Sequence, residues 1–281
     1  MQTKEGKITT KDGLSLYWKG WIPEGKPKAV VHVMHGFAEH INRYMNVVNE
    51  LVVDGYAIFG NDHRGHGRSE GVKGKRCHLN SFMEYIEDEK QFMEEVVKKE
   101  VPGVPYFVLG HSMGSIIATN FMAKYPEGVK GLVLSGTGSM PGPDIGKVTI
   151  ILLQILSKII PSIIVKSPLD PNFISRDKDV VKAYIEDPYV FEVLSPRLGE
   201  QMNTYLLIGA GKVKDVKTPV LIQIGAEDRS FSGKQELFDN FGSTDKKIYL
   251  YEGLRHEVYN ELIEDRKKVL SDLHKWLNAH I

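Results

Sequence analysis

Short apolar runs recur along the chain, and most of them end in or beside glycine. They occupy residues 29–36, 56–62, 106–112, 131–137, 220–228 and 247–253. Continuous apolar runs with little alternation are typical of strands that are covered on both faces of a sheet. An earlier segment, 14–21, alternates in character and is followed by prolines and a glycine, so we predict an antiparallel strand there.

Helical periodicity fills the intervals between these runs. The helical patterns cover residues 41–54, 79–100, 113–125, 234–241 and 261–280. Strands and helices that alternate in this way predict an α/β fold with a mostly parallel sheet, flanked by helices and joined by right-handed crossovers.

The alternation is interrupted once, between residues 139 and 217. This stretch contains no convincing strand, begins with a segment rich in proline and glycine, and then carries helical patterns. It is too long for a loop in a compact domain. We therefore predict a core made of residues 1–138 and 218–281, with 139–217 inserted as an all-helical cap over the strand ends.

One part of this predicted cap, residues 148–165, is almost entirely apolar. Lys158 and Pro161 interrupt it, whereas a membrane-spanning helix needs about 20 apolar residues with few charges. The pattern therefore favours a buried helix or a helix that touches a membrane surface. In the membrane hypothesis three lysines lie near lipid head groups, namely Lys147, Lys158 and Lys166. A homodimer contact and plain cap core are the alternatives for this apolar surface.

Composition and charge exclude several classes of protein. The chain has 281 residues, of which 42% are hydrophobic and 26% charged, as in an ordinary folded protein. Lys plus Arg and Asp plus Glu both number 36, so no whole-chain positive field attracts nucleic acid. Cys77 is the only cysteine, which excludes an intramolecular disulfide and a cysteine-rich zinc site and fits a reducing compartment. The segment MQTKEGKITTKDG lacks the apolar core of a secretion signal, so we expect a cytoplasmic protein.

A candidate nucleophile lies in the sequence GHSMG, residues 110–114. The pattern G-x-S-x-G alone is weak, but here it joins a predicted strand to a predicted helix, as a nucleophile elbow requires. The small residues allow a tight turn that exposes the hydroxyl of Ser112. The helix that follows directs its positive end toward that hydroxyl.

A base and an acid follow the predicted cap. Only three histidines lie there, and of these His274 belongs to the last amphipathic helix and His280 is the penultimate residue. His256 instead follows the last predicted strand, on a loop that can reach the neighbouring strand ends. Asp228 ends the strand before it, with Glu227 as a poorer neighbour, and gives the order serine, acid, histidine found in such enzymes.

Two backbone amides complete the predicted machinery. One oxyanion donor comes from the residue after the nucleophile, Met113, and the other from the loop after an earlier strand, where Phe37 is the natural candidate. We expect His35 to shape that loop. The sequence NDHRGHGRSEG at 61–71 has the His, Asp and Arg density of a metal or phosphate site, but its glycines after a strand favour a structural loop. No metal or cofactor is required.

Several motifs together resemble one family. They are HGFAEH followed by Arg43-Tyr44, NDHRGHGRSEG (61–71), GHSMG (110–114), GAED (225–228) and YEGLRHEVYNE (251–261). In combination they are similar to the monoacylglycerol lipases and related lysophospholipases of the α/β-hydrolase superfamily. The resemblance implies the same nucleophile, acid, base and amide donors, and it places Glu39 and Arg43 near the polar end of the substrate. Ser115 departs from the pattern, because many members carry a second glycine there.

We therefore expect a serine ester hydrolase that cleaves a small lipid ester, most simply a monoacylglycerol, into its acyl chain and a small polar alcohol. Ser112, His256 and Asp228 would act through an acyl-enzyme. A lysophospholipase or general carboxylesterase, and an N-terminal peptidase, are the enzymatic alternatives. A non-catalytic homologue that binds a small apolar ligand is the alternative from another class.

Overall fold

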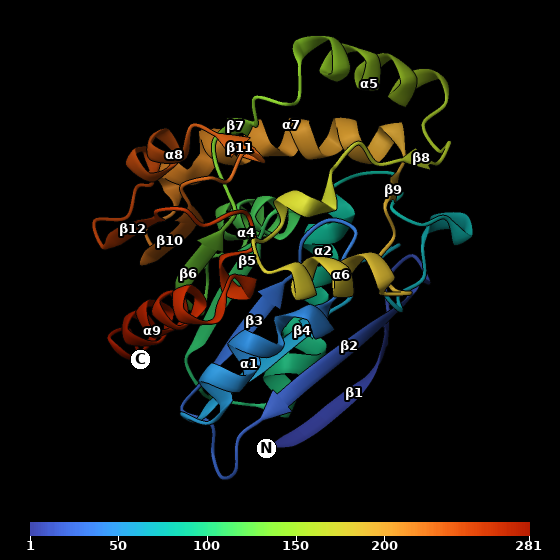
Figure 1. Ribbon diagram of the computed structural model, residues 1–281. Coiled ribbons are helices and arrows are strands. Elements are labelled where there is room, and N and C mark those ends of the chain that lie inside the picture. The colour runs from blue at the N-terminus through green and yellow to red at the C-terminus, as the bar shows by residue number, and fades with distance from the viewer.

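The computed structural model describes residues 1–281 and is built around one sheet of eight strands (Figure 1). In spatial order they are β1 (Gln2–Thr9), β2 (Ser15–Ile22), β4 (Tyr56–Asn61), β3 (Ala29–Met34), β5 (Tyr106–His111), β6 (Val129–Ser135), β10 (Val220–Gly225) and β12 (Lys246–Tyr251). β2 pairs antiparallel with both β1 and β4, and all other neighbours are parallel. The mostly parallel α/β sheet is the one predicted from the apolar runs.

Strand β1 was not predicted, because its sequence QTKEGKIT is almost wholly polar. It forms the outer edge of the sheet, and Ile8 is its only buried residue. In the structure, exposed and partly covered positions alternate along β1, as in any edge strand. A single apolar residue in the sequence is too weak a signal to predict this alternation. Charged lysines on an exposed edge also oppose pairing with another chain.

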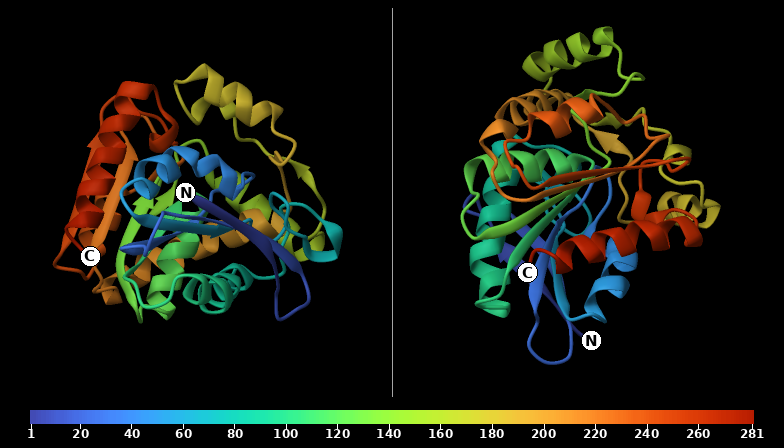
Figure 2. Two further views of the ribbon diagram at one scale, coloured as in Figure 1. Left: turned by 90° about the horizontal axis from the view of Figure 1, so that it is seen from below. Right: turned by 90° about the vertical axis from the view of Figure 1, so that its left-hand side faces the viewer.

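Helices cover both faces of the sheet (Figure 2). Those of the core are α1 (Met45–Val52), α2 (Met83–Phe92), α3 (Lys98–Glu100), α4 (Met113–Lys124), α8 (Lys234–Asn240) and α9 (Ile263–Asn278). α1 and α9 lie on one face and α2 and α4 on the other. Side chains of the central strands alternate between two buried clusters of 26 and 39 residues, one on each face. This double burial explains the continuous apolar runs.

Residues 139–217, which we call the cap segment, connect β6 to β10. Their helices are α5 (Lys147–Ile159), α6 (Lys178–Glu186) and α7 (Pro196–Lys212). α7 packs on α4, and α5 packs on α7 at the top of Figure 1. The expectation of an all-helical insertion was too simple, because β7 (Met140–Pro141) pairs with β11 (Phe231–Ser232), and β8 (Val165–Lys166) with β9 (Val193–Leu194). The division into core and cap domains stays a prediction.

Helix α5 corrects the hypothesis that this apolar segment is buried. Only Ser157 is buried in α5, and its Oγ donates to Glu200 Oε2 of α7 at 3.3 Å. Most of its apolar side chains face outward instead: Val148 is 80% and Ile159 70% exposed, and Ile151 and Leu152 are about half exposed. No helix in the protein combines the length and apolar character needed to cross a bilayer.

The strand order creates a crevice at the centre of the sheet. The chain leaves β3 for β4 on one side, whereas β5 lies on the other side of β3. Ligands of open α/β sheets bind where the connections diverge in this way, beyond the carboxyl ends of the strands. Met34 of β3 pairs with Gly110 of β5, so the loops that begin at His35 and His111 lie side by side.

Candidate active site

Ser112 lies on a strained turn between β5 and α4. Its φ of 53° and ψ of −119° are rarely adopted by a residue with a side chain. The turn depends on the flanking glycines, since a Cβ on Gly114 would overlap the carbonyl oxygen of Met34 and one on Gly110 would overlap that of Gly114. The elbow geometry expected from G-x-S-x-G is therefore present, and it leaves the Ser112 side chain partly exposed.

Ser115, the residue that departs from the family pattern, stabilises this turn. Its side chain is buried, and Oγ lies 2.6 Å from Ser112 O and 3.0 Å from Thr137 Oγ1. The hydroxyl accordingly occupies space that a glycine would leave open and does not displace the backbone.

Asp228 and His256 meet because they follow neighbouring strands. Gly225 of β10 pairs with Tyr251 of β12, and the Glu227 N–H donates to Leu254 O at 2.9 Å, which ties the two loops together. His256 Nδ1 donates to Asp228 Oδ2 at 2.9 Å. The side chain of Glu227 is exposed.

The electrostatics of this pair suit a proton acceptor. Burial alone would raise the pKa of Asp228, but the His256 charge, its hydrogen bond and the Ser230 N–H hold it far below its usual value. Burial would lower the pKa of His256, yet Asp228, followed by Glu257 and Glu39, raises it above 6.5. The ring is thus held with Nδ1 protonated and Nε2 available to accept a proton.

The second histidine of this region, His111, has a different role. Its ring centroid lies 4.7 Å from that of His256, and its Nδ1 pairs with Ser135 Oγ at 2.8 Å. Burial, followed by the nearby charge of His256, lowers the pKa of His111 to about 3. His111 is therefore a neutral packing partner of the base.

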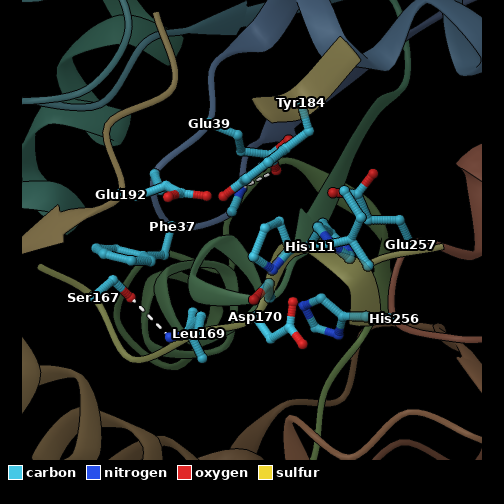
Figure 3. A pocket seen from close by; sticks show the side chains of 15 residues that line it. Phe37, Glu39, His111, Ser167, Leu169, Asp170, Tyr184, Glu192, His256 and Glu257 are labelled. Carbon is cyan, nitrogen blue, oxygen red and sulfur yellow. Dashed lines mark hydrogen bonds between the residues drawn. The ribbon is translucent and has the colours of Figure 1, made fainter. Parts of the chain in front are cut away.

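Ser112 and His256 line one hollow of about 500 Å³, part of which is open solvent (Figure 3). Phe37 and Glu39 border it from the core, and the cap segment closes the other side with residues that no motif had singled out: Ser167, Leu169, Asp170, Tyr184 and Glu192. Four carboxylates and no lysine or arginine line the hollow, the carboxylates being Glu39, Asp170, Glu192 and Glu257. Glu192 Oε1 is buried without a hydrogen-bond partner.

Glu39 and Arg43 form an ion pair, and Glu257 joins them in an ionic cluster that the sequence did not predict. Arg43 Nη1 donates to Glu39 Oε2 at 2.7 Å, and the guanidinium donates twice to Glu257, at 2.7 and 2.8 Å. Arg43 borders a smaller hollow beside the main one. A helical turn begins at Ile41, after Glu39. Glu257 was missed because its partner is 214 residues away in the sequence.

The two proposed oxyanion donors lie beside Ser112. The Phe37 N–H donates no hydrogen bond within the protein, and its residue lines the hollow. Met113 is the first residue of α4, where N–H groups lack an acceptor in their own helix. Both amides are therefore without a backbone acceptor in the protein.

The loop at 61–71 supports the neighbouring loop of the site. Asp62 accepts from the Ile41 N–H at 2.9 Å and from the Arg68 N–H at 2.8 Å. No group of three or more His, Cys, Asp or Glu side chains is arranged to hold a metal ion. The density of polar residues in this loop thus serves internal hydrogen bonding.

A strained serine beyond the centre of a sheet with this strand order, in one hollow with a histidine that follows the last strand, is the arrangement shared by the α/β-hydrolases, and the chain has that fold. A family model described as serine aminopeptidase, S33, matches residues 25–263, so the chain belongs to this family.

Known proteins narrow the relationship further. The chain is 34% identical over 276 residues to the monoacylglycerol lipase of Mycolicibacterium smegmatis, covering 96% of this chain and 95% of that one. It is 30% identical to the human monoglyceride lipase, covering 96% of this chain and 89% of the relative. The crystal structure of Paleococcus ferrophilus monoacylglycerol lipase superposes with a TM-score of 0.85 at 29% identity and covers 95% of this chain and 99% of that one. The protein is a hydrolase of the monoacylglycerol lipase family.

Proposed function

We propose that the protein hydrolyses monoacylglycerols to glycerol and a fatty acid through an acyl-enzyme on Ser112. The observation that carries this proposal is the hydrogen bond from His256 to Asp228 beside the hollow that also holds Ser112. The names of the relatives from M. smegmatis and human support the substrate class.

In the first half of the reaction, Ser112 Oγ attacks the ester carbonyl while His256 Nε2 takes the hydroxyl proton. The Phe37 and Met113 amides stabilise the oxyanion, and one such donor is worth about 2.7–4 kcal/mol. As the C–O bond breaks, His256 returns the proton to the leaving glycerol oxygen. His256 then activates a water molecule, which releases the fatty acid and restores Ser112.

Glu39 and Arg43 act at the polar end of the substrate in this proposal. Glu39 borders the hollow and can accept a hydrogen bond from a glycerol hydroxyl, whereas Arg43 holds Glu39 and Glu257 in place. The acidic lining favours a neutral, hydroxyl-bearing alcohol and repels the phosphate of an anionic lysophospholipid. An amine would also suit Asp170 and Glu192, so aminoacyl amides belong in the substrate panel.

The exposed face of α5 is the proposed contact with a lipid surface, and the protein would then associate peripherally with membranes. Two observations favour a lipid surface as the occupant. The apolar residues Val148, Ile151 and Ile159 are exposed together, and the exposed lysines Lys147, Lys158 and Lys166 complement anionic head groups. Self-association through α5 is the competing outcome of the test.

A fluorophosphonate label mapped by mass spectrometry, beside a panel of monoacylglycerols, lysophospholipids and aminoacyl amides, tests the proposed function. We expect labelling at Ser112 and fastest turnover of monoacylglycerols. Ser112→Ala should abolish labelling and reduce kcat by about 10⁶. Labelling that persists in this variant, or a parent enzyme that leaves every ester intact, would refute the proposal.

A further inference from the structure

A buried histidine–carboxylate pair lies behind the loop that carries Phe37. His63, which follows β4, and Glu89 of α2 are both fully buried, and His63 Nδ1 lies 2.9 Å from Glu89 Oε1. His32 Nε2 of β3 lies 2.7 Å from the other carboxylate oxygen. Burial alone would raise the pKa of Glu89, but contacts with His32 and His63 hold it at about 2. The carboxylate is therefore ionised and acts only as an acceptor.

The second ring nitrogen of His63 reaches the loop after β3. His63 Nε2 lies 3.1 Å from the carbonyl oxygen of His35, and the His63 backbone N–H donates to His35 Nε2 at 2.9 Å. The His35 carbonyl oxygen can only accept, so His63 Nε2 is the donor in this contact. The two imidazole rings lie with their centroids 4.0 Å apart.

These contacts determine the tautomer of His35. Because its Nε2 accepts from the His63 N–H, its proton is on Nδ1, which donates to Gly36 O at 2.7 Å. The peptide group between His35 and Gly36 is held as well. Its N–H, on Gly36, donates to Glu39 Oε1 at 2.6 Å, and its carbonyl, on His35, accepts from His63. Both successive peptide planes are thus fixed in orientation.

The second of these planes contains the Phe37 N–H. In a planar trans peptide the C=O and N–H bonds point in opposite directions. When His35 Nδ1 holds the Gly36 carbonyl on one side, the Phe37 N–H must point to the other side, into the hollow with Ser112. We propose that the His63–Glu89 pair is a positioning unit that, through His35, aims the Phe37 amide at the oxyanion.

This inference rests on the proposed function, because it assumes an oxyanion at Ser112. His63 touches no reacting atom, so its effect must appear in the transition state. An interaction made only there changes kcat and kcat/KM equally and leaves KM unchanged. A misplaced group of about 1 Å can cost about 10²-fold in rate.

Two variants of His63 distinguish an effect on the orientation of the Phe37 amide from an effect on the stability of the protein. In His63→Asn the amide nitrogen takes the place of Nδ1, which keeps an N–H group beside Glu89 and removes the donor to His35 O. In His63→Gln the amide nitrogen takes the place of Nε2, which keeps the donor to His35 O and deprives Glu89 of its partner. The backbone N–H of residue 63 is present in both.

The experiment measures kcat and KM on a water-soluble butyrate ester together with thermal unfolding of each variant. We expect His63→Asn to lower kcat about 10- to 100-fold with KM unchanged, and His63→Gln to keep kcat within about threefold although it is the less stable variant. A kcat that falls in step with the melting temperature in both variants, or full kcat in His63→Asn, would overturn the inference. Failure of the parent to cleave esters would instead refute the proposed function.

Discussion

The hydrogen bond from His256 Nδ1 to Asp228 determines which ring nitrogen is left free to accept a proton. Asp228→Asn keeps the shape but presents an amide donor that favours the wrong tautomer, and we expect kcat to fall about 10⁴-fold. The matched control is Glu227→Gln, because this neighbouring carboxylate is exposed, whereas the hydrogen bond of His256 goes to Asp228. Steady-state kinetics on a soluble ester measure both. Near-normal activity of Asp228→Asn would move the acid role to another residue.

The charge of Glu257 acts on the base beside it. His256 must be neutral to accept a proton, so kcat/KM falls as the pH drops through its pKa, which lies above 6.5. Glu257→Gln removes a negative charge and leaves Arg43 less neutralised, and both changes lower the pKa of His256. The acid limb of the pH profile should therefore move to lower pH. Glu252→Gln, on the exposed surface of the same loop, should leave it unmoved. A shift to higher pH would contradict the assignment.

The sequence revealed the candidate residues that directly follow a strand, because the carboxyl ends of parallel strands must meet. Ser112, Asp228 and His256 all have this placement. It did not reveal Glu257, although this residue adjoins His256, because its place is set by Arg43 from a distant loop. Asp170, Tyr184 and Glu192 were missed for a related reason: the cap segment carries no motif and its position over the core is decided by packing.

At the scale of elements, two of the three glycines of α7, Gly209 and Gly211, have opposite surroundings. A Cβ on Gly209 would lie 2.8 Å from Asn120 Nδ2 of α4, an amide that is held by the carbonyls of Ile116 and Tyr205. A Cβ on Gly211 would meet nothing within 4 Å. The close approach of α4 therefore requires a glycine at position 209, whereas nothing in the surroundings of position 211 requires one.

Urea unfolding of the two alanine variants tests this difference. Gly209→Ala should destabilise the protein by about 1–3 kcal/mol through overpacking between α7 and α4. Gly211→Ala should stabilise it by about 0.5–1 kcal/mol, because alanine leaves the unfolded chain less conformational freedom to lose on folding than glycine does. Shifts of the same sign in both variants would mean that α7 does not approach α4 as described.

Elements were predicted best where both faces are buried. The inner strands show as continuous apolar runs, whereas β1 has only Ile8 to mark it. The helical character of α5 was predicted, but its burial stayed open. The sequence of an apolar helix does not tell whether the chain itself or a surface outside it covers the apolar face.

At the scale of the whole molecule, the exposed apolar face of α5 predicts how the protein meets its substrate. Replacing both Ile151 and Leu152 with Ser shortens two half-exposed apolar side chains. We expect at least tenfold weaker binding to anionic liposomes, since each CH₂ group buried in lipid contributes about 0.8 kcal/mol. Turnover of long-chain monoacylglycerols should fall, while butyrate esters are cleaved as before. Liposome flotation and kinetics measure the two effects.

The control is Val53→Ser, which removes a still more exposed apolar side chain at the end of α1, away from α5 (Figure 1). It should leave liposome binding unchanged. Unaltered liposome binding in the α5 variant, together with loss of self-association, would identify α5 as a contact between two copies of the chain.

The position of the cap segment also has a consequence for synthesis on the ribosome. β6 neighbours β10 in the sheet, yet the entire cap segment is made between them. At about 5–20 residues per second this takes several seconds. During that time the nascent chain presents the edge of β6 without a partner, and such edges are templates for aggregation. His256 emerges later still, so the growing chain passes through a vulnerable, inactive stage in which chaperones have an unpaired edge to protect.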